Sequence, residues 1–200
     1  MALRYGDDAP RARALQMRLF AAVPLAEPAR GEVVRLLDAL RAQDWPVRWV
    51  SDELVHITLK FFGEVPGERL DVIAEALRLA AAGAAPMTLR LSSLGAFPTE
   101  RRPRVLWAGI EADSSFSALR ERIENACDAI GFAREGVPFA PHVTLGRLRE
   151  GQRLPAHALE SPAGAISPET FVADELALYE SILTPTGPRY EARASIRLGE

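Results

Sequence analysis

The sequence has one cysteine and almost no excess of charge of either sign. Cys127 alone cannot form a disulfide within the chain, which excludes a disulfide-stabilised scaffold and favours a reducing compartment. The formal net charge is −3, which leaves no strongly basic surface to hold long nucleic acid by counterion release. We therefore expect any nucleic-acid ligand to be held locally, at an end.

Long apolar runs and several familiar site motifs are also missing. No stretch reaches the roughly 18 apolar residues of a membrane span, and residues 1–16 lack the apolar core of a secretory signal, so we expect a cytoplasmic protein without membrane contact. The absence of H-E-x-x-H and C-x-x-C argues against a metal site. The absence of a P-loop, G-x-G-x-x-G and G-x-S-x-G removes the usual support for ATP hydrolysis, dinucleotide binding and serine esterase chemistry. No cofactor is expected.

The remaining pattern alternates strand and helix signals along 200 residues, of which 48% are hydrophobic, enough for a substantial core. Alternating or β-branched runs predict strands at 16–24, 55–65, 87–97, 104–112, 141–148, 170–181 and 190–198. Apolar residues at helical spacing predict helices within 28–43, 67–83 and 115–132, with Cys127 packed inside the last. Residues 149–168, rich in proline, glycine and alanine, are expected to form a loop.

This order predicts an α+β fold built from a duplicated unit. We expect two antiparallel sheets that face each other across a central cleft, with helices on the outer faces. Residues 15–200 would form a single bilobal domain, and residues 1–14 an N-terminal tail. Because two lobes of one chain make such a cleft, no protein partner is required and a monomer is expected.

Two of the predicted strands carry the same four-residue pattern, His-x-Thr-Leu, beginning at His56 and at His142. Successive side chains of a strand point to opposite faces, so His56 shares a face with Thr58, and His142 with Thr144. The intervening apolar residues then point to the core. If the two strands face one cleft, two imidazoles and two hydroxyls converge in it.

Such a group of side chains suits displacement at phosphorus. One neutral imidazole removes a proton from attacking water while a protonated one donates to the departing oxygen. Threonine hydroxyls donate hydrogen bonds to the non-bridging phosphate oxygens, and no metal is needed. A single strand histidine beside a threonine is most often structural. The chain has only three histidines, however, and two lie in matching strands, whereas His157 falls in the loop and is expected at the surface.

At these residues the chain resembles the two-histidine (2H) phosphoesterase superfamily, and within it the RNA 2′,3′-cyclic phosphodiesterases, also called 2′-5′ RNA ligase-like or LigT-like proteins. Besides HITLKF and HVTLGR, the segments MRLFAAVPL, LRLSSLGAFPTERRPRVLWAGI and ELALYESILTPTGPRY are similar to the family's own, in the same order. The resemblance implies metal-independent hydrolysis of a terminal 2′,3′-cyclic phosphate on RNA to a 2′-phosphomonoester. It also implies that His56 is the general acid, His142 the general base, and Thr58 and Thr144 phosphate ligands. The residues alone leave acid and base unassigned, because the site is nearly symmetric.

Two basic residues follow the motifs. Arg147 matches the family's basic position after the second motif, and a guanidinium suits bidentate phosphate contact. Counting from His142, however, position 147 points to the core unless Gly146 permits a bulge. Lys60 has the same parity as His56 and is a further candidate for phosphate contact.

A terminal nucleotide also needs an aromatic surface on which its base can stack. Phe62, Phe139 and Tyr179 are the candidates, together with Trp49 and Phe97. The alternation of side chains along the strand places Phe61 on the face opposite His56, toward the core. Trp107 is also expected in the core.

Three functional interpretations remain after this reasoning. The first is hydrolysis of an RNA 2′,3′-cyclic phosphate, with reverse 2′-5′ ligation as a minor activity. The second is a phosphodiesterase acting on another small cyclic or 2′-5′-linked nucleotide. The third is an RNA- or nucleotide-binding module without turnover, against which the presence of two proton-transfer groups argues.

Overall fold

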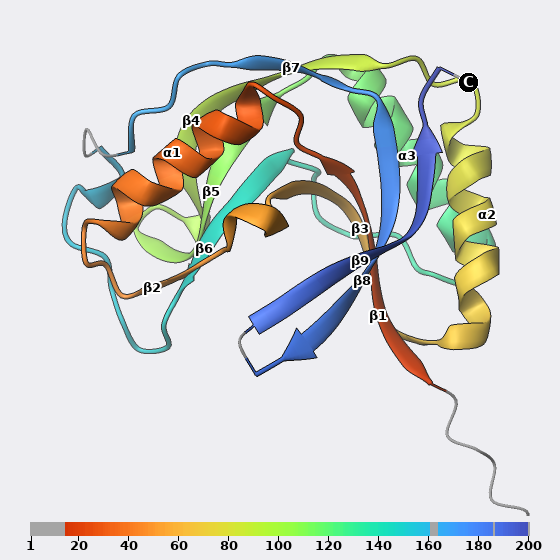
Figure 1. Ribbon diagram of the computed structural model, residues 1–200, viewed down its shortest axis with the longest axis horizontal. Helices are drawn as coiled ribbons and strands as arrows, with labels where there is room; N and C mark the ends of the chain where they lie inside the picture. The colour runs from red at the N-terminus through yellow and green to blue at the C-terminus, as the bar shows by residue number, and fades with distance from the viewer. Residues whose placement is uncertain (1–14, 161–163, 186, 200) are drawn as a thin grey trace, which may run out of the picture.

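The computed structural model describes residues 15–160, 164–185 and 187–199 (Figure 1), so the predicted tail, 1–14, lies outside the described residues. The strands are β1 (Gln16–Pro24), β2 (Val47–Trp49), β3 (His56–Pro66), β4 (Met87–Thr99), β5 (Arg102–Glu111), β6 (His142–Leu148), β7 (Thr170–Ala173), β8 (Glu175–Thr184) and β9 (Gly187–Arg197). The α-helices are α1 (Ala29–Arg41), α2 (Leu70–Ala81) and α3 (Ser114–Ala129), with short 3-10 turns η1 (Asp52–Leu54), η2 (Gly67–Arg69) and η3 (Ala158–Glu160).

All three predicted helices form, and α3 has a side-chain cap at its start and a glycine just past its end. Asp113 caps α3 by accepting a hydrogen bond from the backbone N–H of Ser115 at 2.8 Å. Gly131, just past the end of α3, has a φ of +90°, which glycine adopts without a side-chain penalty. Cys127 is fully buried on the packed face of α3, as predicted, and burial raises the pKa of its thiol to about 11.

The nine strands within the described residues form one connected antiparallel sheet in the order β7-β4-β5-β6-β3-β1-β8-β9, with β2 on β6. The expectation of two separate sheets is therefore not met. The two halves join where β3 meets β6, at the single cross-strand pair Ile57–Val143. The result is an α+β fold with one curled sheet, in which the His-x-Thr strands are neighbours at the centre.

The predicted strand 170–181 is in fact two strands at distant positions in the sheet. β7 pairs with β4 at one edge, whereas β8 pairs with β1 and β9 near the other. Only Asp174 lies between them, so the sheet must curl until its two ends approach each other. In Figure 1 the β8–β9 hairpin projects from the body of the molecule below η1. The short strand β2 was missed because three residues carry little periodicity.

The helices all pack against one face of the curled sheet. The main core joins α1, α2 and α3 to sheet residues such as Ala21, Val23, Ile57 and Val143, each at most 1% exposed. The side chains of neighbouring positions point to the opposite, concave face, which we call the cleft face. No helix within the described part of the chain is long and apolar enough to cross a membrane.

Candidate active site

Strand β1 shows which residues of β3 point into the cleft. Cross-strand partners share a face, and the partners of Pro24, Ala22 and Phe20 are His56, Thr58 and Phe61. Leu59 has no partner of its own, because Ala21 pairs with Lys60 and Ala22 with Thr58. Leu59 is thus the extra residue of a β-bulge, which reverses the alternation of β3 immediately after the first motif.

Strand β5 shows the same arrangement in β6. Gly109, Trp107 and Val105 share a face and pair with His142, Thr144 and Arg147. Here Leu145 is the extra residue, since Leu106 pairs with Gly146 and Trp107 with Thr144. The two motifs therefore carry the same bulge at the same leucine, and the two histidines and two threonines lie on one face, as predicted.

Each of the two histidines is held by a hydrogen bond to the backbone carbonyl two residues before it. The Nδ1–H of His56 donates to the carbonyl of Leu54 at 2.7 Å, and the Nδ1–H of His142 donates to the carbonyl of Ala140 at 2.8 Å. Because a carbonyl oxygen can only accept, each neutral ring carries its proton on Nδ1 and leaves the Nε2 lone pair free for chemistry. The hydroxyl of Thr58 donates to Nε2 of His56 at 3.0 Å.

Burial lowers the pKa of both imidazoles. For His56 desolvation is the largest cause, opposed by the Leu54 carbonyl and reinforced by the nearby charge of His142. For His142 desolvation is again the largest cause, opposed by the Ala140 carbonyl and reinforced by the positive charge of Arg147. Both rings are therefore neutral at pH 7 in the free protein. Protonation of His142 would lower the pKa of His56 further, and the charge of Arg147 acts in the same way on His142.

Arg147 lies on the cleft face. The sequence predicted this position only if a bulge preceded Arg147, and the structure has that bulge at Leu145. It pairs with Val105, two positions from Trp107 on the same face of β5, and its side chain is exposed. Burial is the main cause that lowers the pKa of His142, and the charge of Arg147 adds to it. Burial raises the pKa of Tyr190, a residue of β9, and the charge of Arg147 opposes that rise. Arg147 thus lies within electrostatic reach of both sides of the cleft.

Lys60 does not lie on the cleft face, and its prediction by parity from His56 is wrong. The bulge at Leu59 turns the side chain into the core, where it is 1% exposed. Its ammonium donates to Glu124 Oε2 at 2.8 Å and to the carbonyl of Ala133 at 2.9 Å. Arg120, also buried, forms a second ion pair with Glu124 at 2.8 Å. Lys60 therefore links β3 to α3 and does not reach the cleft face.

The same bulge reverses the predictions for the following phenylalanines. Phe61 is 57% exposed and its ring contacts Phe20 on the cleft face. Phe62 instead packs against Phe132 and the main core, so its prediction as a stacking residue is wrong in position. Phe139 also packs against the core, beside Phe116.

Aromatic rings flank each histidine on the cleft face. Phe20 lies 4.9 Å from His56 between ring centroids and Tyr190 lies 5.4 Å from it, and Tyr179 stacks on Phe20. Of the predicted stacking candidates, Tyr179 is therefore placed beside the motif. Phe20 and Tyr190 were missed, since nothing in their local sequence separates them from ordinary strand residues.

The other histidine has its own aromatic neighbours. Phe97 lies 5.0 Å from His142 between ring centroids, and Trp107 lies 6.3 Å from it. Trp107 is not in the main core, contrary to prediction, because it shares the cleft face of β5 with Gly109, the partner of His142. Its cross-strand partner on the other side is Gly95, and the Trp107 ring occupies the space that a side chain at Gly95 would fill. Trp49 packs against the core beside Trp45.

A cavity of about 520 Å³ opens beside His56. It is lined by η1, by Val55 and His56 at the start of β3, and by the β8–β9 hairpin, including Tyr179, Arg189 and Tyr190. Its lining combines two phenol rings with charged and hydroxyl side chains, a mixture that suits a polar molecule with a flat ring system.

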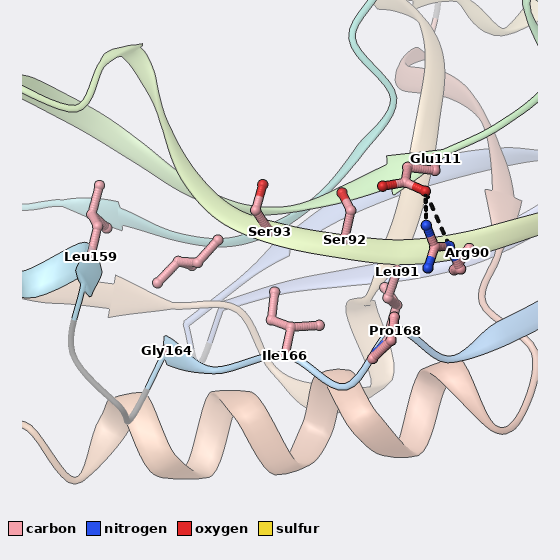
Figure 2. Close-up of a pocket in the computed structure, with 10 residues that line it drawn as sticks. Arg90, Leu91, Ser92, Ser93, Glu111, Leu159, Gly164, Ile166 and Pro168 are labelled. Atoms are coloured by element: carbon pink, nitrogen blue, oxygen red, sulfur yellow. Dashed lines mark hydrogen bonds and ion pairs between the residues drawn. The ribbon is translucent and has the colours of Figure 1, made fainter.

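A second cavity, of about 420 Å³, lies elsewhere (Figure 2). The ion pair of Arg90 with Glu111 lies at one end and Leu159 at the other, and Gly164 and Ile166 line the side nearer α1. None of the predicted site residues lines this cavity, and it holds no imidazole. The chemistry predicted from the motifs therefore belongs to the cleft face.

The chain is similar to known proteins over most of its length. A sequence model described as the 2′-5′ RNA ligase superfamily matches residues 28–183. A Geobacillus stearothermophilus RNA 2′,3′-cyclic phosphodiesterase is 36% identical over 90% of the chain, although the chain spans only 56% of that protein. A Methanothermobacter thermautotrophicus protein of the same name is 33% identical over 92% of the chain and 100% of its own length.

Solved structures show the same fold. The crystal structure of the Thermus thermophilus protein TT0787 matches with a TM-score of 0.76 at 30% sequence identity. The match covers 91% of this chain and 98% of that one. The curled sheet and the helices on its outer face are thus shared across nearly the whole molecule.

Proposed function

The chain belongs to the 2′-5′ RNA ligase superfamily, and from this we propose that it is an RNA 2′,3′-cyclic phosphodiesterase, a hydrolase that opens a terminal 2′,3′-cyclic phosphate to a 2′-phosphomonoester. The observation that carries the proposal is the Ile57–Val143 pair, which brings two His-x-Thr motifs together on one face. Binding alone would not require two proton-transfer groups so arranged.

In the proposed reaction water attacks phosphorus and the bond to the 3′ oxygen breaks. His142, neutral because burial lowers its pKa, takes a proton from water on Nε2. His56 must enter the step protonated, and the negatively charged phosphate bound beside it raises the pKa of this imidazole relative to the free protein. Its Nε2–H is then given to the leaving 3′ oxygen, so the proton count balances over the cycle.

The phosphate oxygens are the proposed ligands of Thr58, Thr144 and Arg147. Thr58 already presents its hydroxyl to Nε2 of His56, where a bound phosphate would replace the imidazole as hydrogen-bond partner. Arg147 adds a cation on the side of His142, where negative charge develops as water loses its proton. The fit of these groups to phosphate needs no cofactor or metal.

The terminal nucleoside would occupy the cavity beside His56, because His56 serves the 3′ oxygen and that oxygen stays on the terminal ribose. Tyr179 and Tyr190 line this cavity and offer ring faces to a base. Tyr179 is therefore retained as a proposed stacking residue, and Tyr190 joins it.

The matching bulges at Leu59 and Leu145 support a duplicated unit, each half contributing one histidine and one threonine. We take residues 15–200 as one bilobal domain, active as a monomer, since both halves of the site come from one chain. A cytoplasmic location fits a substrate that is an RNA end.

The test is incubation with an oligoribonucleotide ending in a 2′,3′-cyclic phosphate, in excess EDTA, comparing wild type with His56→Ala and His142→Ala. We expect a 2′-phosphate product that persists in EDTA and falls by about 10² to 10⁴ in each variant. His157→Ala is the matched control, because this imidazole is exposed and pairs with Glu160, away from both His-x-Thr motifs. Binding without turnover in the wild type would support the non-catalytic module, and turnover restricted to other cyclic or 2′-5′-linked nucleotides would support the second interpretation.

A further inference from the structure

A second arginine stands directly opposite Arg147. Strand β2 pairs with β6 so that Arg48 is the cross-strand partner of Arg147. Partners across an antiparallel pair share a face and have Cβ atoms about 5 Å apart. Val47 and Trp49, on either side of Arg48, pack against the core, so the exposed Arg48 points to the cleft face with Arg147.

Neither guanidinium has an acidic partner among the residues that the structure describes. This contrasts with arginines on the outer helices, where Arg35 pairs with Glu32, Arg41 with Asp38 and Asp52, and Arg78 with Glu75. Like charges directly opposite one another in a sheet are destabilising. Two adjacent, unpaired guanidiniums are therefore best explained by an anion that binds between them.

The position of the pair along β6 indicates which phosphate it meets. β3 and β2 pair with successive parts of the same edge of β6, first at Val143 and then at Gly146 to Leu148. Arg147 follows His142 by five residues that include a bulge, roughly 13 Å along the strand. Arg147 has several donors, and its charge is among the causes that lower the pKa of His142, so it can reach the reacting phosphate. Arg48 is not among the causes that shift the pKa of either histidine, so we assign it to the neighbouring phosphate.

We propose that Arg48, together with Arg147, binds a second phosphate of the substrate, the phosphodiester adjoining the terminal nucleotide. The inference rests on the proposed function and deepens it, because it identifies the substrate as an RNA end and not a free cyclic mononucleotide. A mononucleotide has one phosphate and leaves Arg48 unused. An RNA end supplies the second phosphate and neutralises both charges.

The test measures the activity of one variant on two substrates. For Arg48→Ala, kcat/KM is measured on adenosine 2′,3′-cyclic phosphate and on an oligoribonucleotide ending in the same cyclic nucleotide. We expect a loss of roughly tenfold or more on the oligoribonucleotide, with little change on the mononucleotide and a shallower salt dependence of oligoribonucleotide binding. Arg48→Lys should recover part of the loss. Arg78→Ala removes the same charge from outer helix α2 and should leave both substrates unaffected.

An equal fall in kcat/KM on both substrates, or no fall on either, would overturn the second-phosphate site. The proposed function has a separate readout, the wild type's turnover of either substrate. Should turnover be absent, anisotropy of a labelled oligoribonucleotide ending in a 2′-phosphate still decides the inference. Weaker binding by Arg48→Ala than by Arg78→Ala supports it, and equal binding contradicts it.

Discussion

Phe61 in β3 and Arg147 in β6 occupy equivalent positions, each two residues beyond a bulged leucine and each on the cleft face. The first half of the molecule thus presents an exposed ring where the second presents a cation. The near symmetry of the two motifs ends at this position. It is the point from which the two sides of the cleft acquire different chemistry.

Removal of the Arg147 charge should change the titration of His142. Because Arg147 lowers the pKa of His142, Arg147→Ala should raise this pKa, measured by NMR titration of the ring. Loss of a charge-assisted phosphate contact, of about 1.5–3 kcal/mol, should lower kcat/KM by roughly 10- to 100-fold. Phe61→Ala, at the equivalent position, is the control and should not move the His142 titration. An unchanged pKa in Arg147→Ala would show that the arginine lies out of electrostatic reach.

Lys60 should matter for stability and not for phosphate contact. Lys60→Met removes one buried partner of Glu124, which keeps Arg120, and should lower the free energy of unfolding by about 1–3 kcal/mol in urea denaturation. Because Lys60 and Glu124 are in contact, the double variant Lys60→Met/Glu124→Gln should lose less stability than the sum of the two single variants. The exposed pair of Arg78 with Glu75 is the comparison, and breaking it should cost at most about 1 kcal/mol. A near-neutral Lys60→Met would contradict the buried ion pair.

Acidification should weaken the fold partly through the imidazoles of His56 and His142. Burial lowers the pKa of His56 and of His142 below the ordinary value of about 6.5 that they take when unfolded. As pH falls through 6.5, the unfolded chain therefore binds protons that the folded protein does not, and the free energy of unfolding decreases.

This contribution is measured by urea denaturation at about pH 7.5 and about pH 5.5. The double variant His56→Gln/His142→Gln should lose less stability between the two values than the wild type. Identical losses would mean that neither imidazole has a lowered pKa in the folded protein.

Gly146 keeps β2 in place against β6. A Cβ at Gly146 would lie 2.5 Å from Val47 Cγ1 and 3.0 Å from the carbonyl oxygen of Arg48. Gly146→Ala should therefore displace β2 and destabilise the protein by about 1–3 kcal/mol in thermal or urea unfolding. Gly136→Ala is the matched control, because a Cβ there meets nothing within 4 Å. Equal stability of the two variants would contradict the close approach.

The helices and the His-x-Thr pairs could be predicted because local signals determine them. Helical periodicity fixes α3 regardless of its neighbours, and two residues on one strand share a face without reference to any partner. The aromatic neighbours Phe20, Tyr190 and Trp107 could not be predicted, because their positions depend on which strands lie next to which.

The errors at Lys60, Phe61 and Phe62 have one physical cause. Parity counting assumes an unbroken strand, and a bulge at Leu59 reverses it. The bulge itself leaves little trace in a single sequence, since Leu59 is apolar like its neighbours. In the second motif, Gly146 indicated that a bulge could precede Arg147, because glycine in a strand often marks a bulge.

Asp174 alone separates β7, which completes the edge beside β4, from β8, which lies beside β1. Both halves of the molecule consequently need residues 170–184 before their strands are complete. A ribosome-bound chain that ends before residue 170 would expose the free edges of β4 and β1 at once. Neither half is therefore expected to finish folding before this segment is synthesised, and a nascent chain pausing just before it would be open to wrong strand pairing.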